Sequence, residues 1–261
     1  MAERRVEPVD VTPRPRTTGG VQSIERAFSL LEAVAASDRA MGLSQLAAAC
    51  DLPLPTIHRL ARTLVALGYL RQEPSRQYAL GPRVLLLGES SSKMLNTIAL
   101  PHLAGLVDEL GETANLAMLD GDQVAYVAQV PGRHSMRMFT EVGRRVHPHC
   151  TAVGKSLLSV LPVDDVQALL ARTGLPRHTP HTIVEIDALL EQVQRAAVDG
   201  YALDEGEQEV GVRCLAVPVP APDVHLAVSI SGPAPRMSEE LLRRAVPLLR
   251  GTAGALARDL L

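Results

Sequence analysis

The residue types that could do chemistry gather between positions 147 and 155. His147, His149 and Cys150 supply imidazole nitrogens and a thiol, which are zinc ligands and can also act together as base and nucleophile. Thr151 follows, and its hydroxyl can cap a helix whose first N–H groups and positive dipole end would hold a carboxylate. The segment therefore fits an anion pocket, a metal site or a cysteine-dependent enzyme.

A second set of polar residues lies near the end of the chain. Ser229 and Ser231 stand two apart in an apolar, strand-like run, so their hydroxyls share one face of a sheet. Val212, Cys214 and Ala216 alternate in the same way in the preceding run. Paired hydroxyls beside a thiol would line a small polar pocket, although serines on a solvated sheet face give the same pattern.

The metal and enzyme interpretations stay open as alternatives to a binding protein. A metal-responsive site would combine His147, His149 and Cys150 with the distant Cys214, but the two histidines alternate across an extended segment and no Cys-x-x-Cys pair occurs. An enzyme would use Cys150 activated by His149 or His181, and nothing in the sequence orders such a pair. The primary prediction therefore includes no catalytic residue, no metal and no cofactor.

A third set of residues is basic. Between positions 53 and 83 five arginines accompany a single acidic residue, Glu73, in a chain of net charge −3. A local positive excess in an acidic protein points to a polyanion at one end. Aromatic residues make up only 2% of the chain, which disfavours base stacking with single-stranded nucleic acid. Double-stranded DNA is therefore the predicted partner.

The elements around these arginines predict a winged helix-turn-helix. Apolar residues recur at three and four positions over 21–37, which indicates an amphipathic helix. Ser44 is predicted to cap a short second helix, and Pro55 suits the first turn of a third. Gly68 would end that third helix, and residues 70–80 read as a two-stranded hairpin.

In this motif the second helix of the helix-turn-helix enters the major groove, and the wing touches the DNA backbone. The buried stripe of that helix is predicted to be Ile57, Leu60 or Ala61, and Leu64. The outward-facing side chains and the hairpin arginines are then the candidates for DNA contact: Ser44, Thr56, His58, Arg59, Arg62, Thr63, Arg71 and Arg76.

The rest of the chain predicts a mixed α/β domain on an antiparallel sheet. Two helical stretches are expected at about 82–95 and 97–110, followed by a hairpin that turns at Asp120-Gly121. Strand-like runs and helices then alternate, with the strands at 136–140, 212–219 and 224–230 and the helices at about 151–161, 163–173, 186–199 and 238–260.

Several blocks, taken in order, resemble the IclR family (isocitrate lyase regulator type) of transcription factors. Gly20-Val-Gln-Ser-Ile-Glu-Arg-Ala-Phe and Leu54-Pro-Thr-Ile-His-Arg-Leu-Ala-Arg are similar to its DNA-binding half. His149-Cys-Thr-Ala-Val-Gly-Lys, Gly211-Val-Arg-Cys-Leu-Ala and Ala227-Val-Ser-Ile-Ser-Gly-Pro are similar to its effector-binding half. The resemblance covers about 20–250.

The resemblance implies an α+β fold: an N-terminal winged helix-turn-helix, a helical linker and a C-terminal GAF-like α/β effector-binding domain with an antiparallel sheet. The expected parts are a disordered arm at 1–19, the DNA-binding domain at 20–83, linker helices at 84–111 and the effector domain at 112–261. By the same resemblance, the effector pocket uses Cys150, Thr151, Ala152, Gly154, Asp204, Cys214, Ser229 and Ser231.

The implied function is that of a transcriptional regulator, a repressor rather than an activator, whose operator affinity is set by a small metabolite. Family members form dimers and dimers of dimers, so a homodimer or homotetramer is expected. The stretches 124–130 and 137–146 are similar to members that respond to ureides such as allantoin or allantoate. A small carboxylate of the glyoxylate or aromatic-acid kind is the alternative effector.

The expected location is the cytoplasm. Three cysteines in 261 residues do not form a disulfide framework, the charged N-terminus lacks the apolar segment of a secretory signal, and no run is long and apolar enough to predict a membrane span.

Overall fold

The computed structural model describes residues 20–37, 39–135, 141–221 and 224–260. The chain divides between Ser91 and Ser92 into two compact units, each with a hydrophobic core of its own. The predicted arm at 1–19 and the strand-like run at 136–140 lie outside the described residues. Among the helices that are described, none has the length and apolar character needed to cross a membrane.

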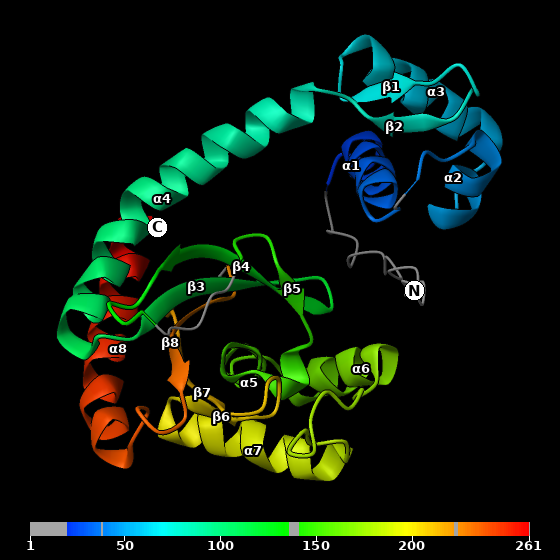
Figure 1. Ribbon diagram of the computed structural model, residues 1–261. Helices are drawn as coiled ribbons and strands as arrows, with labels where there is room; N and C mark the ends of the chain where they lie inside the picture. The colour runs from blue at the N-terminus through cyan, green and yellow to red at the C-terminus, as the bar shows by residue number, and fades with distance from the viewer. Residues whose placement is uncertain (1–19, 38, 136–140, 222–223, 261) are drawn as a thin grey trace, which may run out of the picture. The chain divides into compact units, whose positions relative to one another are not determined.

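The N-terminal unit is a winged helix-turn-helix, as predicted. Its elements are α1 (Gln22–Ala35), α2 (Leu43–Ala49), α3 (Leu54–Ala66), β1 (Leu70–Gln72) and β2 (Tyr78–Leu80). The two strands pair antiparallel as the wing (Figure 1). Leu30, Leu46, Ile57, Leu70 and Tyr78 come from these different elements and form one buried core, so each helix and the wing is held by apolar side chains from the others.

The ends of the short helices follow local rules, with one correction. Pro55 lies in the first turn of α3, and Gly68 ends α3 with a φ of +80° that favours glycine. Ser44, however, does not cap α2. The helix begins one residue earlier, the cap position is Gly42, and its backbone N–H donates to Oε1 of Gln45 at 2.8 Å. Gln45 thus holds the backbone of the cap residue, and no side chain caps the free N–H groups of the first turn of α2.

The expected pair of helices after the wing is a single helix, α4 (Arg83–Leu110), so the predicted break near residue 96 is wrong. Thr97 lies at the predicted break, and its hydroxyl donates to the carbonyl of Lys93 one turn earlier, a bond that helices accommodate. Pro101 lies inside the helix and removes one backbone donor. Ala99 and Leu103 beside it are fully buried, and this burial outweighs the lost hydrogen bond.

The C-terminal unit is built on an antiparallel sheet of six strands in the order β5-β4-β3-β8-β7-β6. The strands are β3 (Thr113–Asp120), β4 (Gln123–Val130), β5 (Arg145–Val146), β6 (Ala202–Glu205), β7 (Val212–Pro218) and β8 (Leu226–Pro233). The β3–β4 hairpin turns as predicted, with Gly121 at a φ of +60°. The short strands β5 and β6 were not predicted, and they form the two edges of the sheet.

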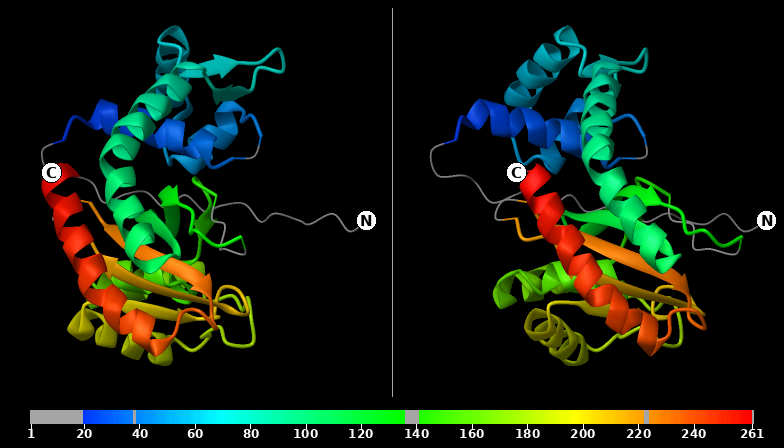
Figure 2. Two further views of the ribbon diagram at one scale, coloured as in Figure 1. Left: turned by 60° about the vertical axis from the view of Figure 1, so that its left-hand side comes forward. Right: turned by 90° about the vertical axis from the view of Figure 1, so that its left-hand side faces the viewer.

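Helices cover both faces of this sheet (Figures 1 and 2). The second part of α4 and α8 (Glu239–Leu260) pack on one face. On the other face lies α5 (Ala152–Leu158), with α6 (Val163–Thr173) and α7 (Ile186–Asp199) packed beyond it. Val228 and Ile230 of β8 face the α4–α8 side, so Ser229 and Ser231 face the α5 side.

Candidate functional site

The outward face of α3 carries the predicted DNA-contacting side chains. Ile57, Ala61 and Leu64 are buried, as expected, and Leu60 is half-buried. The polar residues of the helix lie on the other side: Thr56 is half-buried, and His58, Arg59, Arg62 and Thr63 are exposed. The helix therefore presents a polar and positively charged surface of the kind that reads a major groove.

The wing adds two exposed arginines, one on β1 and one in the turn between its strands. Arg71 on β1 makes an ion pair of 3.0 Å with Glu73, and both side chains are partly open to solvent. An exposed ion pair of this kind contributes little, so it does not prevent Arg71 from contacting a phosphate. Arg76 lies in the turn between the strands with a left-handed φ of +65°. Ser44, at the second position of α2, is exposed as well.

In the C-terminal unit, strand register gathers the predicted pocket residues on one sheet face. Asp204 of β6 is paired with Cys214 of β7, and Cys214 with Ser231 of β8. Ser229 is paired with Asn115 of β3. Residues that pair directly in an antiparallel sheet point to the same side. The prediction that the serines and Cys214 share a face is therefore confirmed.

The serines are buried, so their interpretation as residues of a solvated face is wrong. Ser229 is 1% exposed and Ser231 is 4% exposed. Asn115 Nδ2 donates to both hydroxyl oxygens, at 3.3 Å and 3.1 Å, and its own Oδ1 accepts from Gln129 Nε2 at 3.0 Å. Ser231 also hydrogen-bonds the side chain of Cys214 beside it, so the two serines, Asn115 and Cys214 form one polar group on this face.

The start of α5 lies beside this face. Thr151 caps the helix, since its hydroxyl oxygen accepts from the backbone N–H of Gly154 at 3.1 Å, as predicted. Gly154 is required by packing, because a Cβ there would lie 2.2 Å from the carbonyl oxygen of Pro148. Ala152 and Cys150 are buried on either side of the cap.

A buried ion pair joins α5 to the turn that follows β6. Lys155 Nζ lies 2.5 Å from Glu207 Oε1 and 2.8 Å from Gln192 Oε1 of α7. Lys155 is 1% exposed and Glu207 is 3% exposed. Both side chains are thus almost completely buried, and Lys155 has two partners, while Glu207 Oε2 has no hydrogen-bond partner among the described residues.

Asp204 is held close to this pair. Its Oδ1 accepts from the backbone N–H of Glu207 at 2.7 Å, and the residue is 2% exposed. Burial raises the pKa of its carboxyl to about 7, and the nearby Glu207 charge adds to the rise, while the backbone hydrogen bond opposes it. The carboxyl therefore changes its charge near neutral pH.

The thiols in the cluster are protonated and weakly reactive. Burial, with the charges of Asp204 and Glu207, raises the pKa of Cys150 to about 12. Burial and Asp204 also raise the pKa of Cys214 far above its usual value. Cys150 Sγ donates to Gln208 Oε1 at 2.9 Å, and the nearby His149 directs its Nε2 to the carbonyl of Pro176 at 3.1 Å. This geometry does not activate Cys150 as a nucleophile.

The sequence missed several residues that complete the cluster. Asn115 orients both serines, Gln208 accepts from Cys150, and His178 brings a second imidazole close to the thiol. Two features of the sequence could have pointed to this cluster: the single amide in Ala114-Asn115-Leu116 and the lysine in Gly154-Lys155-Ser156. A polar side chain within an apolar strand or helix needs a partner when it is buried.

A cavity of about 490 Å³ opens elsewhere on the C-terminal unit, beside α7 and β6. Its lining includes Lys155, Glu207, Gln192, Arg195 and Tyr201. None of the eight predicted effector residues lines it. Lys155 and Glu207 of the ion pair line the cavity, and the rest of its lining includes residues of α7 and β6. The cavity is therefore separate from the sheet face that carries Cys214 and the two serines.

A winged helix-turn-helix joined to an α/β unit with a buried polar cluster defines a DNA-binding protein with a domain suited to a small ligand. Residues 23–74 match the IclR helix-turn-helix domain, and residues 90–258 match the C-terminal domain of the bacterial transcriptional regulator IclR. The chain belongs to the IclR family of transcriptional regulators.

Relatives match almost the whole chain. It is 35% identical over 232 residues to the transcriptional repressor IclR of Escherichia coli, covering 85% of this chain and 84% of the relative. It is 31% identical over 244 residues to the repressor AllR of Salmonella typhi, covering 92% of this chain and 90% of the relative. The crystal structure of an IclR homologue from Microbacterium hydrocarbonoxydans, complexed with 4-hydroxybenzoate, has 25% identity and a TM-score of 0.61, covering 92% and 99%.

The raised pKa of Asp204 predicts a pH-dependent stability. An unfolded carboxyl loses its proton near the usual 3.8, and the folded one near 7. Between these values the folded state holds more protons, so wild-type stability falls as pH rises through this window. Asp204→Asn keeps an acceptor but has no proton to lose. We expect its melting temperature relative to wild type to rise from about pH 4 to about pH 8.

Thermal melting across this window measures the effect, with Asp199→Asn as the matched control. Asp199 is an exposed aspartate at the end of α7. The melting temperature of the control relative to wild type should stay constant with pH. A constant difference for Asp204→Asn as well would show that Asp204 ionises as an ordinary surface carboxyl.

Proposed function

We propose that this regulator is a repressor that binds its operator through α3 and the wing. The observation that carries the proposal is the division of α3 into a buried apolar stripe and an exposed polar face with Arg59 and Arg62. The base and phosphate contacts are assigned to the predicted set: Ser44, Thr56, His58, Arg59, Arg62, Thr63, Arg71 and Arg76. Two of the matched relatives are named as repressors, which supports the direction of control.

The active form is proposed to be a homodimer or homotetramer acting in the cytoplasm. One winged helix covers too little DNA for strong operator selection, and two-fold assemblies that read two half-sites solve this. Several large apolar side chains around α1 and at the start of α4 are exposed, which is consistent with a surface that another copy of the chain covers. They include Val21, Ile24, Phe28, Leu85, Leu86 and Leu87.

The controlling signal is proposed to be a small metabolite bound at the sheet face beside α5. Cys150, Thr151, Ala152 and Gly154 border this region from the start of α5. Asp204, Cys214, Ser229 and Ser231 border it from the sheet. Serine hydroxyls and a carboxyl that is partly neutral near pH 7 can donate to a ligand with carbonyl or carboxylate oxygens.

Two effector classes fit these groups. A ureide offers both carbonyl acceptors and N–H donors, and the donors suit the oxygens of Asp204. A small carboxylate is the second class, and a structural relative is complexed with the aromatic acid 4-hydroxybenzoate. Part of the segment that resembles ureide-responsive members, 137–140, lies outside the described residues.

Catalysis is not part of the proposed function. A cysteine-dependent enzyme needs a thiolate, and burial with two nearby carboxylates opposes ionisation of Cys150. Family membership in transcriptional regulators points the same way.

Operator recognition is tested at Arg59. Arg59→Ala is expected to weaken operator binding by about 1–3 kcal/mol, because a bidentate contact to a guanine edge is lost. The full chain is titrated by fluorescence anisotropy against a labelled duplex selected by the wild-type protein from random-sequence DNA. All titrations use one salt concentration, since protein–DNA affinity depends steeply on salt.

Arg243→Ala is the charge-matched control, because Arg243 is an exposed arginine on α8 in the other unit. It should bind the selected duplex like wild type. Equal binding by Arg59→Ala, with its circular dichroism unchanged, would remove Arg59 from the operator contacts.

The effector site is tested by the double variant Ser229→Ala, Ser231→Ala. Allantoin, allantoate, glyoxylate and 4-hydroxybenzoate are first screened by thermal shift, since a ligand at ~100 times its Kd stabilises by roughly 2.7 kcal/mol. The double variant should bind the selected compound more weakly by about 1–3 kcal/mol, because two hydrogen bonds are lost. Its operator affinity without the compound should stay close to wild type, because the serines lie in the other unit and are proposed to act only through the ligand. The ligand in turn changes operator affinity only by binding two arrangements of the protein unequally.

Arg195→Ala in the 490 Å³ cavity is the comparison variant. It should keep full ligand affinity in calorimetry. If Arg195→Ala loses the ligand while the serine variant keeps it, the effector binds in the cavity. If the serine variant loses operator binding without ligand, the serines support the fold and not the pocket.

A further inference from the structure

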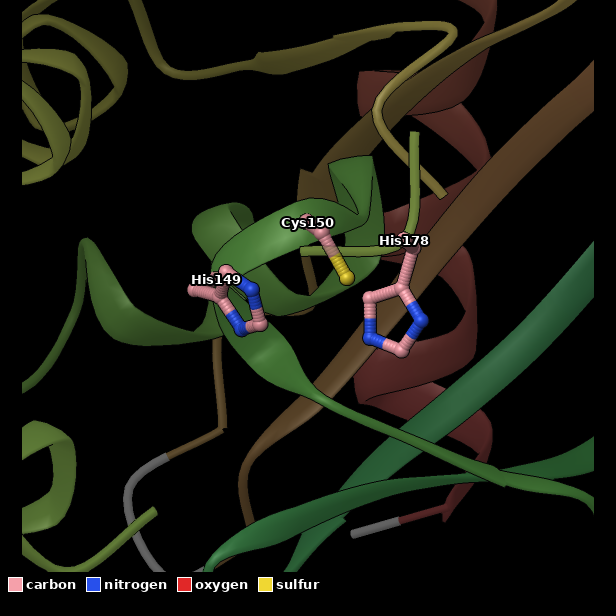
Figure 3. Close-up of side chains that lie close together, drawn as sticks. All are labelled: His149, Cys150 and His178. Atoms are coloured by element: carbon pink, nitrogen blue, oxygen red, sulfur yellow. The ribbon is translucent and has the colours of Figure 1, made fainter. Parts of the chain in front are cut away.

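Three metal-binding side chains converge at the start of α5. His149 and Cys150 lie in the single 3-10 turn Pro148–Cys150, and His178 comes from the segment between α6 and α7. One ligand atom from each lies within 4.8 Å of the other two. Figure 3 shows the sulfur of Cys150 pointing between the two imidazole rings. Chain segments distant in sequence thus bring two nitrogens and a sulfur to one point.

His149 has an acceptor nitrogen that its surroundings leave unused. The residue is 0% exposed, and among the described residues its Nδ1 has no hydrogen-bond partner. Nε2 lies 3.1 Å from the carbonyl oxygen of Pro176, so Nε2 carries the proton and Nδ1 the lone pair. A backbone carbonyl that fixes the tautomer in this way is the usual outer partner of a metal-binding histidine.

A further imidazole, that of His147, lies close to the cluster. The His147 ring centre lies 5.6 Å from that of His149 and 5.4 Å from that of His178. A third imidazole therefore lies beside the two that converge with Cys150.

We infer that His149 Nδ1, Cys150 Sγ and His178 form a binding site for a borderline divalent metal ion such as Zn²⁺. Two imidazoles and one thiolate are a donor set that Zn²⁺ takes, with His147 or water completing a tetrahedron. Ligands about 2.0–2.3 Å from zinc lie roughly 3.3–3.8 Å from one another. The three ligand atoms lie within 4.8 Å of one another, so they must move closer together when the metal binds. His178 is exposed, so its ring can make this movement, and its position marks the entry path of the ion.

Binding exchanges a proton for the metal. The Cys150 thiol donates to Gln208 Oε1 at 2.9 Å, and a thiolate cannot donate. The thiol proton leaves to solvent, the metal takes its place on sulfur, and the Gln208 amide turns its Nε2 toward the thiolate. No electron is transferred, and one proton is released for each metal ion bound.

This site differs from the alternative raised by the sequence and from the proposed effector pocket. His178 takes the place that the sequence assigned to Cys214, which is not among the three clustered residues. Cys150 belongs to both sets, whereas His147 and His178 belong to the metal site alone. A loss of metal binding on changing His178 therefore says nothing about the serines, and this variant lets the two proposals fail separately.

The test is calorimetric titration of the full chain, first treated with a chelator and dialysed, with ZnSO₄. One Zn²⁺ per chain is expected, and two buffers of different ionisation enthalpy should report one proton released. His178→Ala and Cys150→Ser should each weaken binding by at least about 10-fold, the smallest loss expected even for an outer-shell partner. Titration with CoCl₂ should give a thiolate-to-cobalt charge-transfer band that Cys150→Ser abolishes.

His181→Ala is the matched control, because His181 is an exposed imidazole three positions along the same segment. It should bind Zn²⁺ like wild type. Zinc affinity unchanged in both His178→Ala and Cys150→Ser would overturn the site. A cobalt complex without the charge-transfer band would also overturn it, because sulfur is then not a ligand.

Discussion

The C-terminal unit depends on the buried ion pair between Lys155 and Glu207. Taking two charges out of water is costly, and their attraction offsets this only when the geometry is good and further hydrogen bonds are made. Here Lys155 Nζ contacts both Glu207 and Gln192, at 2.5 Å and 2.8 Å. The start of α5, the middle of α7 and the turn after β6 must therefore come together, because the absence of one leaves an unpaired charge in the interior.

The candidate sites are arranged around this pair. The backbone N–H of Glu207 donates to Asp204. The backbone carbonyl oxygen of Glu207 accepts from the hydroxyl of Thr182 at 2.6 Å. That same hydroxyl oxygen accepts from the backbone N–H of His178 at 3.0 Å. The ion pair holds the Glu207 side chain, and the backbone of the same residue holds the pocket carboxyl and, through Thr182, the segment that carries His178. Sheet register then places Cys214 and the serines beside them.

The sequence predicted what local rules determine and missed what depends on distant partners. The helix end at Gly68 and the cap at Thr151 follow from backbone conformation and one hydroxyl, so both were predictable. The cap predicted at Ser44 was wrong because α2 begins at Leu43, which places Ser44 inside the helix. The single helix across Pro101 depends on burial in a core formed by other elements. The partner of Lys155 lies 52 residues away, and no spacing in the sequence points to it.

A double-mutant cycle on the ion pair tests this dependence most directly. Urea denaturation of the full chain, followed by circular dichroism, is compared for wild type, Lys155→Met, Glu207→Leu and the double variant. Each single change should cost about 3–5 kcal/mol, since it leaves a buried charge unpaired, and the double variant should cost less than either single one. A double variant whose loss equals the sum of the two single losses would contradict the pairing as the interaction that holds the unit together.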